Sequence, residues 1–241
     1  MSATIAISCV DTAFYTETYK ALSTTLDTLQ NQNIVKIYWF SDVPFDYNLQ
    51  IPVQWVPIPK ITKDYVERSF PMIYNMVGLK LMPMIVGEDY NLIIQDDGFA
   101  VNADAWTDEF LQYDYIGACW GEDVGNGGFS LRSKKLYRAL HNLNVIYNWR
   151  EFPKELYRPE FEGHVWLNTT HADEPIIPED NIICRIYKQD LVTLYGIKFA
   201  PAALADRFSI ENKLQSPWLG RSLGFHGRNG AAKYYNVELK R

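Results

Sequence analysis

The sequence has few of the features that mark disulfide-rich, zinc-binding or membrane-spanning proteins. Its three cysteines, Cys9, Cys119 and Cys184, are an odd number, lie far apart and form no CxxC or Cys/His pattern. This excludes a disulfide framework and a zinc ribbon. No apolar run reaches the roughly 18 residues of a membrane span, and no basic segment precedes the short apolar N-terminus. We therefore expect a soluble cytoplasmic protein without a transmembrane segment.

Positive charge is also scarce. The chain has 23 Lys and Arg against 29 Asp and Glu, a formal charge of −6, and no basic run forms a stripe. This balance argues against nucleic acid or an anionic membrane as a partner. Aromatic residues, in contrast, make up 15% of the chain. Stacking on carbohydrate or on a nucleotide base is one use for such an excess.

Strand and helix patterns alternate along the first half of the chain. Helical spacing of apolar residues over 15–29 and 73–84 separates four short apolar runs, which lie at 4–10, 34–40, 53–58 and 90–95. Strands joined by helices of this length pair in parallel, and a ligand then binds at their carboxyl ends. A length of 241 residues with 47% hydrophobic residues favours one enlarged α/β domain.

The second half of the chain is less regular. We expect a strand within 110–120, a helix from about Ser133, a helix over 183–194 ended by Gly196, and a strand over 197–200. The segment 147–178 is long and irregular, and loops of that length inside a domain are usually functional or mobile. Its aromatic residues are candidates for stacking on an acceptor sugar, or for core or lid positions.

An acidic motif follows the fourth strand. The run from Asn91 ends in Gln95, Asp96 and Asp97 and is followed by a glycine. Two carboxylates at the end of a buried strand suit a divalent cation that lies between the protein and an anionic ligand. A simple Asp-Asp-Gly turn is the alternative, because these are ordinary turn residues.

A glycine-rich segment, 125–130, precedes the helix expected from Ser133. Glycines at 125, 127 and 128 allow the backbone to approach a ligand or to adopt positive φ, and a helix start offers free N–H groups. The segment lacks the Gly-Lys-Ser/Thr ending of a Walker loop and the dinucleotide pattern. A glycine-rich hairpin explains it equally well.

Two further motifs carry candidate catalytic groups. Glu179 and Asp180 follow Pro178 at a helix start, where a carboxylate stays ionised and suits a general base. Ordinary capping also places acids there. His226 lies between glycines at 224 and 227 in a non-periodic tail, and its neutral imidazole is a candidate metal ligand.

Taken in this order, the four motifs resemble a GT-A-type glycosyltransferase. The nearest likeness is to a glycosyltransferase-like bacterial and viral domain family of largely unknown function, in which a strand ends in a Gln-x-Asp pattern. The likeness spans about 74–227. It implies a GT-A-like (Rossmann-like) α/β fold with a mixed, mainly parallel sheet flanked by helices. It also implies a single domain, 1–241, with a nucleotide-binding half at about 1–100 and an acceptor and catalytic half at about 101–241.

The resemblance also implies a role for each motif residue. Asp97 and His226 would bind Mn²⁺ or Mg²⁺, and Asp180, with Glu179 beside it, would be the catalytic base. The implied donor-binding residues are Asp42, Gln95, Asp96, Asp97, Gly127 and Gly128. Gln95 stands where the usual Asp-x-Asp motif has its first Asp, so Asp96 would have to compensate for it.

We therefore expect a metal-dependent glycosyltransferase that moves a sugar from a nucleotide-sugar donor to a carbohydrate or other hydroxyl acceptor with inversion. One alternative is a non-catalytic module of the same fold that binds a glycan or a nucleotide sugar, and the Gln95 departure gives it some support. A sugar nucleotidyltransferase is the other. Such enzymes usually carry a glycine-rich loop with Lys or Arg near the N-terminus, and the residues from Cys9 to Ala13 include neither.

Overall fold

A six-stranded sheet forms the centre of the computed structural model, which describes residues 2–60, 73–143, 145, 177–228, 232–235 and 237. The strand order is β3-β2-β1-β4-β9-β6. Four strands are parallel: β1 (Ile5–Val10), β2 (Ile34–Ser41), β3 (Val53–Pro57) and β4 (Tyr90–Ile94). Strand β9 (Ser130–Ser133) is antiparallel to both β4 and β6 (Tyr115–Gly117). The expected mixed, mainly parallel α/β fold is confirmed.

The strand sequences follow from their burial. All six side chains of β1 are buried, so this strand is a continuous apolar run without alternation, as expected of a parallel strand covered on both faces. Strand β3 lies at the sheet edge, where no side chain is fully buried and Trp55 is exposed. The four strands and the first helix lie where the sequence predicts them, within one or two residues at each end.

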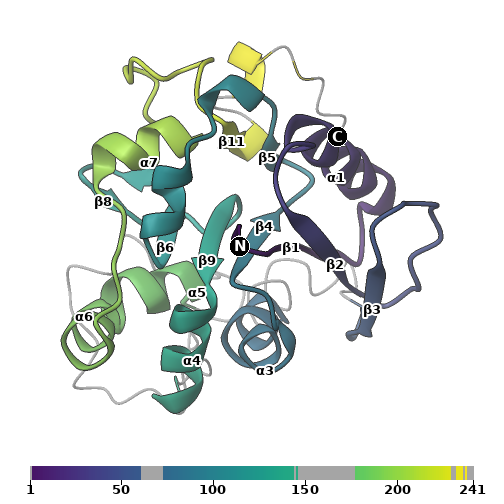
Figure 1. Ribbon diagram of the computed structural model, residues 1–241, viewed down its shortest axis with the longest axis horizontal. Helices are drawn as coiled ribbons and strands as arrows, with labels where there is room; N and C mark the ends of the chain where they lie inside the picture. The colour runs from purple at the N-terminus through teal and green to yellow at the C-terminus, as the bar shows by residue number, and fades with distance from the viewer. Residues whose placement is uncertain are drawn as a thin grey trace, which may run out of the picture.

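Helices cover both faces of the sheet (Figure 1). Helix α1 (Tyr15–Thr28) packs on one face through Thr18, Ala21, Leu22 and Thr25, which share one side of the helix. The other face carries α4 (Lys134–Asn142) and the helical segment formed by η2 (Val77–Leu81) and α3 (Met82–Ile85). Segment η2 is a π-helix, and its wider turn precedes Pro83, which cannot donate a helical hydrogen bond.

Smaller elements lie around the carboxyl end of β4. A three-stranded sheet in the order β10-β11-β5 is formed by β5 (Gly98–Ala100), β10 (Ser209–Ile210) and β11 (Gly224–His226). A hairpin is formed by β7 (Cys119–Trp120) and β8 (Asp123–Val124). The remaining helical segments are η3 (Ala103–Ala105), η4 (Asp108–Gln112), α5 (Glu179–Asn181), η8 (Ile182–Ile186), α6 (Lys188–Tyr195), α7 (Ala202–Phe208) and η10 (Ala232–Tyr235).

Helix α4 begins at Lys134 with Ser133 as its N-cap, which confirms the helix expected from about Ser133. The strand between the glycine-rich segment and this helix was not predicted: β9 pairs with β4 on one side and with β6 on the other. One expectation from the second half needs correction. The strand expected over 197–200 is a single bridge between Phe199 and Tyr115. Gly196 ends the preceding helix as predicted, and its backbone is left-handed there.

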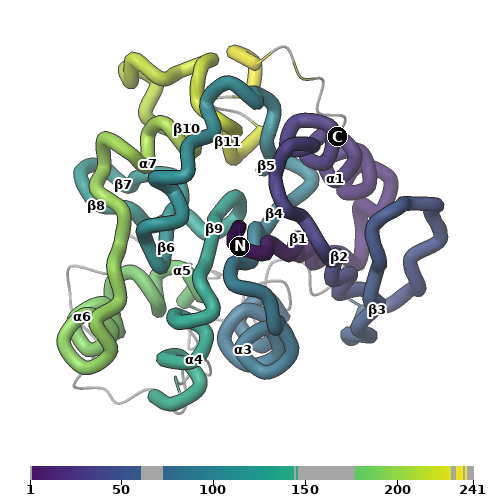
Figure 2. The backbone as a smooth tube through the Cα atoms, in the orientation of Figure 1, coloured from purple at the N-terminus to yellow at the C-terminus, as the bar shows by residue number. Residues whose placement is uncertain are grey.

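The topology fixes where a ligand site belongs. The chain moves outward from β1 to β2 and β3 and then returns to β4 on the other side of β1 (Figure 2). In such sheets ligands bind outside the carboxyl ends of the strands where the order reverses. Gln95 follows β4 at that point. Within the described ranges, no helix combines the length and the apolar character needed to cross a membrane. Most of the irregular segment 147–178 lies outside the described residues.

Candidate functional site

Three neighbouring parallel strands end in polar residues at one edge of the sheet. Asp11 follows β1, Asp42 follows β2 and Gln95 follows β4, and the strand register places them side by side. Asp11 is buried and accepts the N–H groups of Ala13 and Phe14, so it serves to start helix α1. Asp42 accepts the Tyr15 hydroxyl at 2.7 Å and remains the donor-binding candidate at this edge; its role stays a prediction.

The turn after β4 meets the C-terminal histidine. In the small sheet His226 pairs with Gly98, which places the imidazole over that turn. Its Nε2 lies 2.9 Å from Oε1 of Gln95 and 3.7 Å from Oδ1 of Asp97. The structure therefore brings Asp97 and His226 together, although they are far apart in the sequence. Their role as metal ligands stays a prediction.

Glu211, which the sequence analysis missed, orients this histidine. Its Oε1 lies 3.2 Å from Nδ1 of His226, and it follows β10, the strand that pairs with β11. A carboxylate at Nδ1 orients the ring, as in many metal-binding histidines, while Nε2 faces the amide oxygen of Gln95, which can only accept a hydrogen bond. Burial opposes protonation of the imidazole, but Glu211 and Asp97 outweigh it and raise the pKa of His226 above its ordinary value.

Arg228, also missed, provides positive charge beside the acidic turn. Its guanidinium forms an ion pair with Asp96, lies 3.8 Å from Oδ2 of Asp97 through Nε, and packs over the ring of Phe14 at 4.9 Å. Only its position two residues after His226 could have signalled this. The two acids of the motif therefore differ, because Asp96 binds the arginine while Asp97 lies between the arginine and the histidine.

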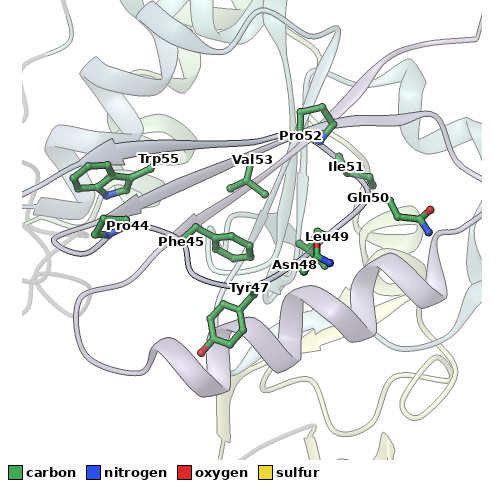
Figure 3. Close-up of a pocket in the computed structure, with 10 residues that line it drawn as sticks. All are labelled: Pro44, Phe45, Tyr47, Asn48, Leu49, Gln50, Ile51, Pro52, Val53 and Trp55. Atoms are coloured by element: carbon green, nitrogen blue, oxygen red, sulfur yellow. The ribbon is translucent and has the colours of Figure 1, made fainter.

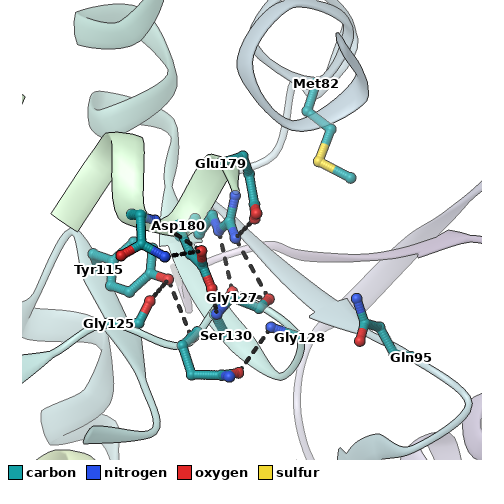
Figure 4. Close-up of polar contacts among 12 residues, drawn as sticks. Met82, Gln95, Tyr115, Gly125, Gly127, Gly128, Ser130, Glu179 and Asp180 are labelled. Carbon is teal, nitrogen blue, oxygen red and sulfur yellow. Dashed lines mark hydrogen bonds and ion pairs between the residues drawn. The ribbon is translucent and has the colours of Figure 1, made fainter. Parts of the chain in front are cut away.

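A second acidic pair lies at α5, across the glycine segment (Figure 4). Glu179 is buried and its Oε1 lies 2.5 Å from Nη2 of Arg132. Asp180 accepts the N–H of Gly127 at 3.1 Å and that of Asn181 at 2.7 Å. The sequence argument that a helix start keeps Asp180 ionised is wrong in direction. Burial, with the charge of Glu179, raises the pKa of Asp180 to about 7, a value suited to a general base.

Two consecutive glycines lie between these clusters. A Cβ at Gly127 would lie 2.6 Å from Oε1 of Glu179, and a Cβ at Gly128 would lie 2.1 Å from Nε2 of His226 and 2.7 Å from Oε1 of Gln95. Neither residue has positive φ. Close approach of side chains, and not backbone conformation, therefore requires glycine at both positions.

A hollow of about 360 Å³ lies apart from these clusters, between β3 and the loop that precedes it (Figure 3). It is lined by Pro44, Phe45, Tyr47, Asn48, Leu49, Gln50, Ile51, Pro52, Val53 and Trp55. None of these side chains is charged and none belongs to the motifs above. The hollow therefore contains none of the candidate catalytic or metal-binding groups.

A protein-family profile matches the part of the chain that contains these motifs. The profile of a family described as "Protein of unknown function (DUF5672)" matches residues 74–226, more than half of the sequence. The chain belongs to this family. The matched range of this DUF5672 protein includes the acidic turn, the glycine pair, the acids of α5 and His226. No curated protein matches the sequence.

Solved structures show the fold of this DUF5672 protein. The galactosyltransferase LgtC, crystallised with donor and acceptor sugar analogues, matches with a TM-score of 0.55 and 12% identity over 96% of this chain and 94% of its own. A glycosyltransferase involved in glycosylation of the major capsid of PBCV-1 matches with a TM-score of 0.46 and 10% identity over 96% of each chain. The LgtC likeness shows a shared GT-A-like fold.

The crowding at the glycine pair predicts a difference between two glycines of the DUF5672 protein. Gly128→Ala should lower the free energy of unfolding by about 1–3 kcal/mol, because the methyl group must displace the His226 ring. Gly87→Ala is the matched control, since a Cβ there meets nothing within 4 Å. Urea denaturation of both variants measures the difference. Equal stabilities would contradict the close packing of Gly128 on His226.

Proposed function

We propose that this protein is a metal-dependent glycosyltransferase that moves a sugar from a nucleotide-diphosphate donor to a hydroxyl of a carbohydrate acceptor. The observation that carries the proposal is the pairing of Asp97 with His226 on one side of the glycine pair and of Asp180 with Glu179 on the other. Both lie at the switch point of a GT-A-like sheet. The sugar analogues bound to LgtC support donor and acceptor sites of this kind.

The donor side is the cluster around His226. No three His, Cys, Asp or Glu side chains among the described residues are placed to hold a metal ion together. Asp97 and His226 supply two ligands, and the amide oxygen of Gln95, 2.9 Å from Nε2, is suited as a third. An oxygen-rich set with one imidazole fits Mn²⁺ or Mg²⁺. Such an ion, when bound, offsets the charge of the departing diphosphate.

The acceptor side is Asp180. A carboxyl with a pKa near 7 takes a proton from an attacking hydroxyl and releases it to water at neutral pH. Its position across the glycine pair from Gln95 and His226 suits an attack from the face opposite the leaving group (Figure 4). Inversion of configuration follows, as it does when a carboxylate activates water in inverting sugar hydrolysis.

The direct test is a panel of nucleoside-diphosphate sugars with Mn²⁺ and simple saccharide acceptors. We expect one donor to be consumed with transfer of its sugar. Donor binding without turnover would instead indicate a non-catalytic module. Turnover only of a nucleoside triphosphate with a sugar phosphate would indicate a nucleotidyltransferase. Each of these two results contradicts the proposal.

Asp97→Asn should weaken binding of Mn²⁺ at least about tenfold, because the variant removes the carboxylate that lies beside Nε2 of His226. Calorimetric titration with Mn²⁺ alone, followed by the donor with and without Mn²⁺, measures the loss. Asp104→Asn, on an exposed residue of η3, is the matched control and should bind as the wild type does. Unchanged Mn²⁺ affinity in Asp97→Asn would remove Asp97 from the metal site.

Asp180→Asn should reduce transfer by about 10²- to 10⁴-fold with donor affinity retained, because it removes the base and leaves the donor side intact. In the wild type, kcat/KM should rise with pH up to about 7 and then level, since the protonated carboxyl cannot accept a proton. Rate measurements from pH 5 to 9 test both statements. Transfer within about tenfold of the wild type would mean another base or a retaining mechanism.

A further inference from the structure

Arg132 is a buried charge directly behind the glycine pair. Its side chain is fully buried in β9, Nη2 lies 2.5 Å from Glu179 and 3.4 Å from the carbonyl oxygen of Gly127, and Nε donates to Ser130 at 3.1 Å. Among the described residues its Nη1 has no hydrogen-bond partner. Apolar side chains of similar volume are often equally stable in place of a buried ion pair. Stability alone therefore does not account for this arginine.

The position of Arg132 couples three parts of the site. Its backbone is fixed on both sides, because it pairs with Asn91 of β4 and with Tyr115 of β6. Its guanidinium reaches the glycine segment and α5 from that fixed point. Gly127, whose carbonyl it contacts, donates its own N–H to Asp180. The sheet thus sets the position of Asp180 through Arg132 and Gly127.

The same guanidinium distinguishes two adjacent acids. Glu179 receives the charged donor, whereas the hydrogen bonds of Asp180 come from neutral groups, the N–H of Gly127 and the N–H and side-chain amide of Asn181. An ion pair adds the Coulomb attraction of two opposite charges to its hydrogen bond, which a neutral N–H donor does not supply. Glu179 is therefore held by the ion pair, and Asp180, which accepts the N–H of Gly127, is the acid without a charged hydrogen-bond partner.

We propose that Arg132 is a positioning residue that selects Asp180 as the base, by binding Glu179 and by fixing the Gly127 carbonyl. This inference rests on the proposed glycosyltransferase function. In that reaction the acceptor oxygen forms a bond to the anomeric carbon as the bond to the diphosphate breaks. The diphosphate leaves with the electron pair, and the proton of the acceptor hydroxyl passes to a carboxylate oxygen of Asp180.

The charged groups around Asp180 determine how the Arg132–Glu179 ion pair affects the pH dependence of transfer. The titratable groups that act on or with Asp180 are Glu179 and Cys184 in the same helical segment, Arg132 on β9, Tyr115 on β6 and His226 on β11. The charge of Glu179 raises the pKa of Asp180 more than that of Arg132 lowers it. Removing both charges therefore lowers the pKa of Asp180.

The test compares the wild type with the double variant Arg132→Met/Glu179→Met, which removes the buried pair without leaving one charge alone. We expect a folded protein with an unchanged KM for the donor and a kcat at least about tenfold lower. The acid limb of its pH–rate profile, where the rate rises with pH, should shift to lower pH. Arg132→Lys, which keeps the charge but not the planar fork, should keep the limb near pH 7 and lose kcat. Arg138→Met, on the exposed side of α4, is the control and should match the wild type.

The outcomes separate the two proposals. A double variant that is folded and retains the kcat and pH profile of the wild type would overturn the role of Arg132 while leaving the glycosyltransferase function intact. A wild type that transfers no sugar from any donor would overturn both. If the double variant fails to fold, kcat of Arg132→Lys decides, because the inference requires kcat to fall while the pH profile stays near that of the wild type. A wild-type kcat in this variant would overturn the role of Arg132.

Discussion

The close approach of the backbone at Gly127 and Gly128 to four side chains is the constraint on which the candidate site depends. On one side the glycines contact Arg132 and Glu179, and on the other they contact His226 and Gln95 at distances that exclude any Cβ. Two clusters that would otherwise be separated by a layer of side chains become neighbours. In the proposed reaction, this is what allows a donor at one cluster and a base at the other to act on the same anomeric carbon.

The sheet makes this approach possible because β9 is inserted antiparallel between β4 and β6. If the segment passed directly from the glycines into a helix, the free N–H groups of the helix start could bind an anionic ligand, as in phosphate-binding loops. Here the segment instead enters a strand whose position is fixed on both edges. This makes the glycine segment rigid, because Arg132 belongs to that strand and its guanidinium donates to the carbonyl oxygen of Gly127 just before it. The small sheet β10-β11-β5 then brings Glu211 and His226 to Gln95.

The fold could be predicted from the sequence where burial is continuous and local. Strand β1 and helix α1 follow from apolar runs and helical spacing. Strand β9 could not, because its four residues, Ser130 to Ser133, include a charged side chain that is buried only through a partner 47 positions away. The neighbourhood of Asp97 and His226 came from family resemblance and not from spacing. Glu211 and Arg228 were missed for the same reason as Arg132, since a local pattern does not indicate which distant group a charge will meet.

The two clusters share one arrangement of charge. Each contains two adjacent acids and an arginine that binds the first of them, Asp96 with Arg228 and Glu179 with Arg132. The second acid of each pair, Asp97 or Asp180, has weaker or neutral partners and lies beside the glycine segment or His226. A carboxylate bound to arginine is a poor proton acceptor and a poor metal ligand, because its lone pairs are already engaged. The acid bound to arginine thus anchors the turn or helix start, and the acid next to it is the one to which the proposed function assigns the chemistry.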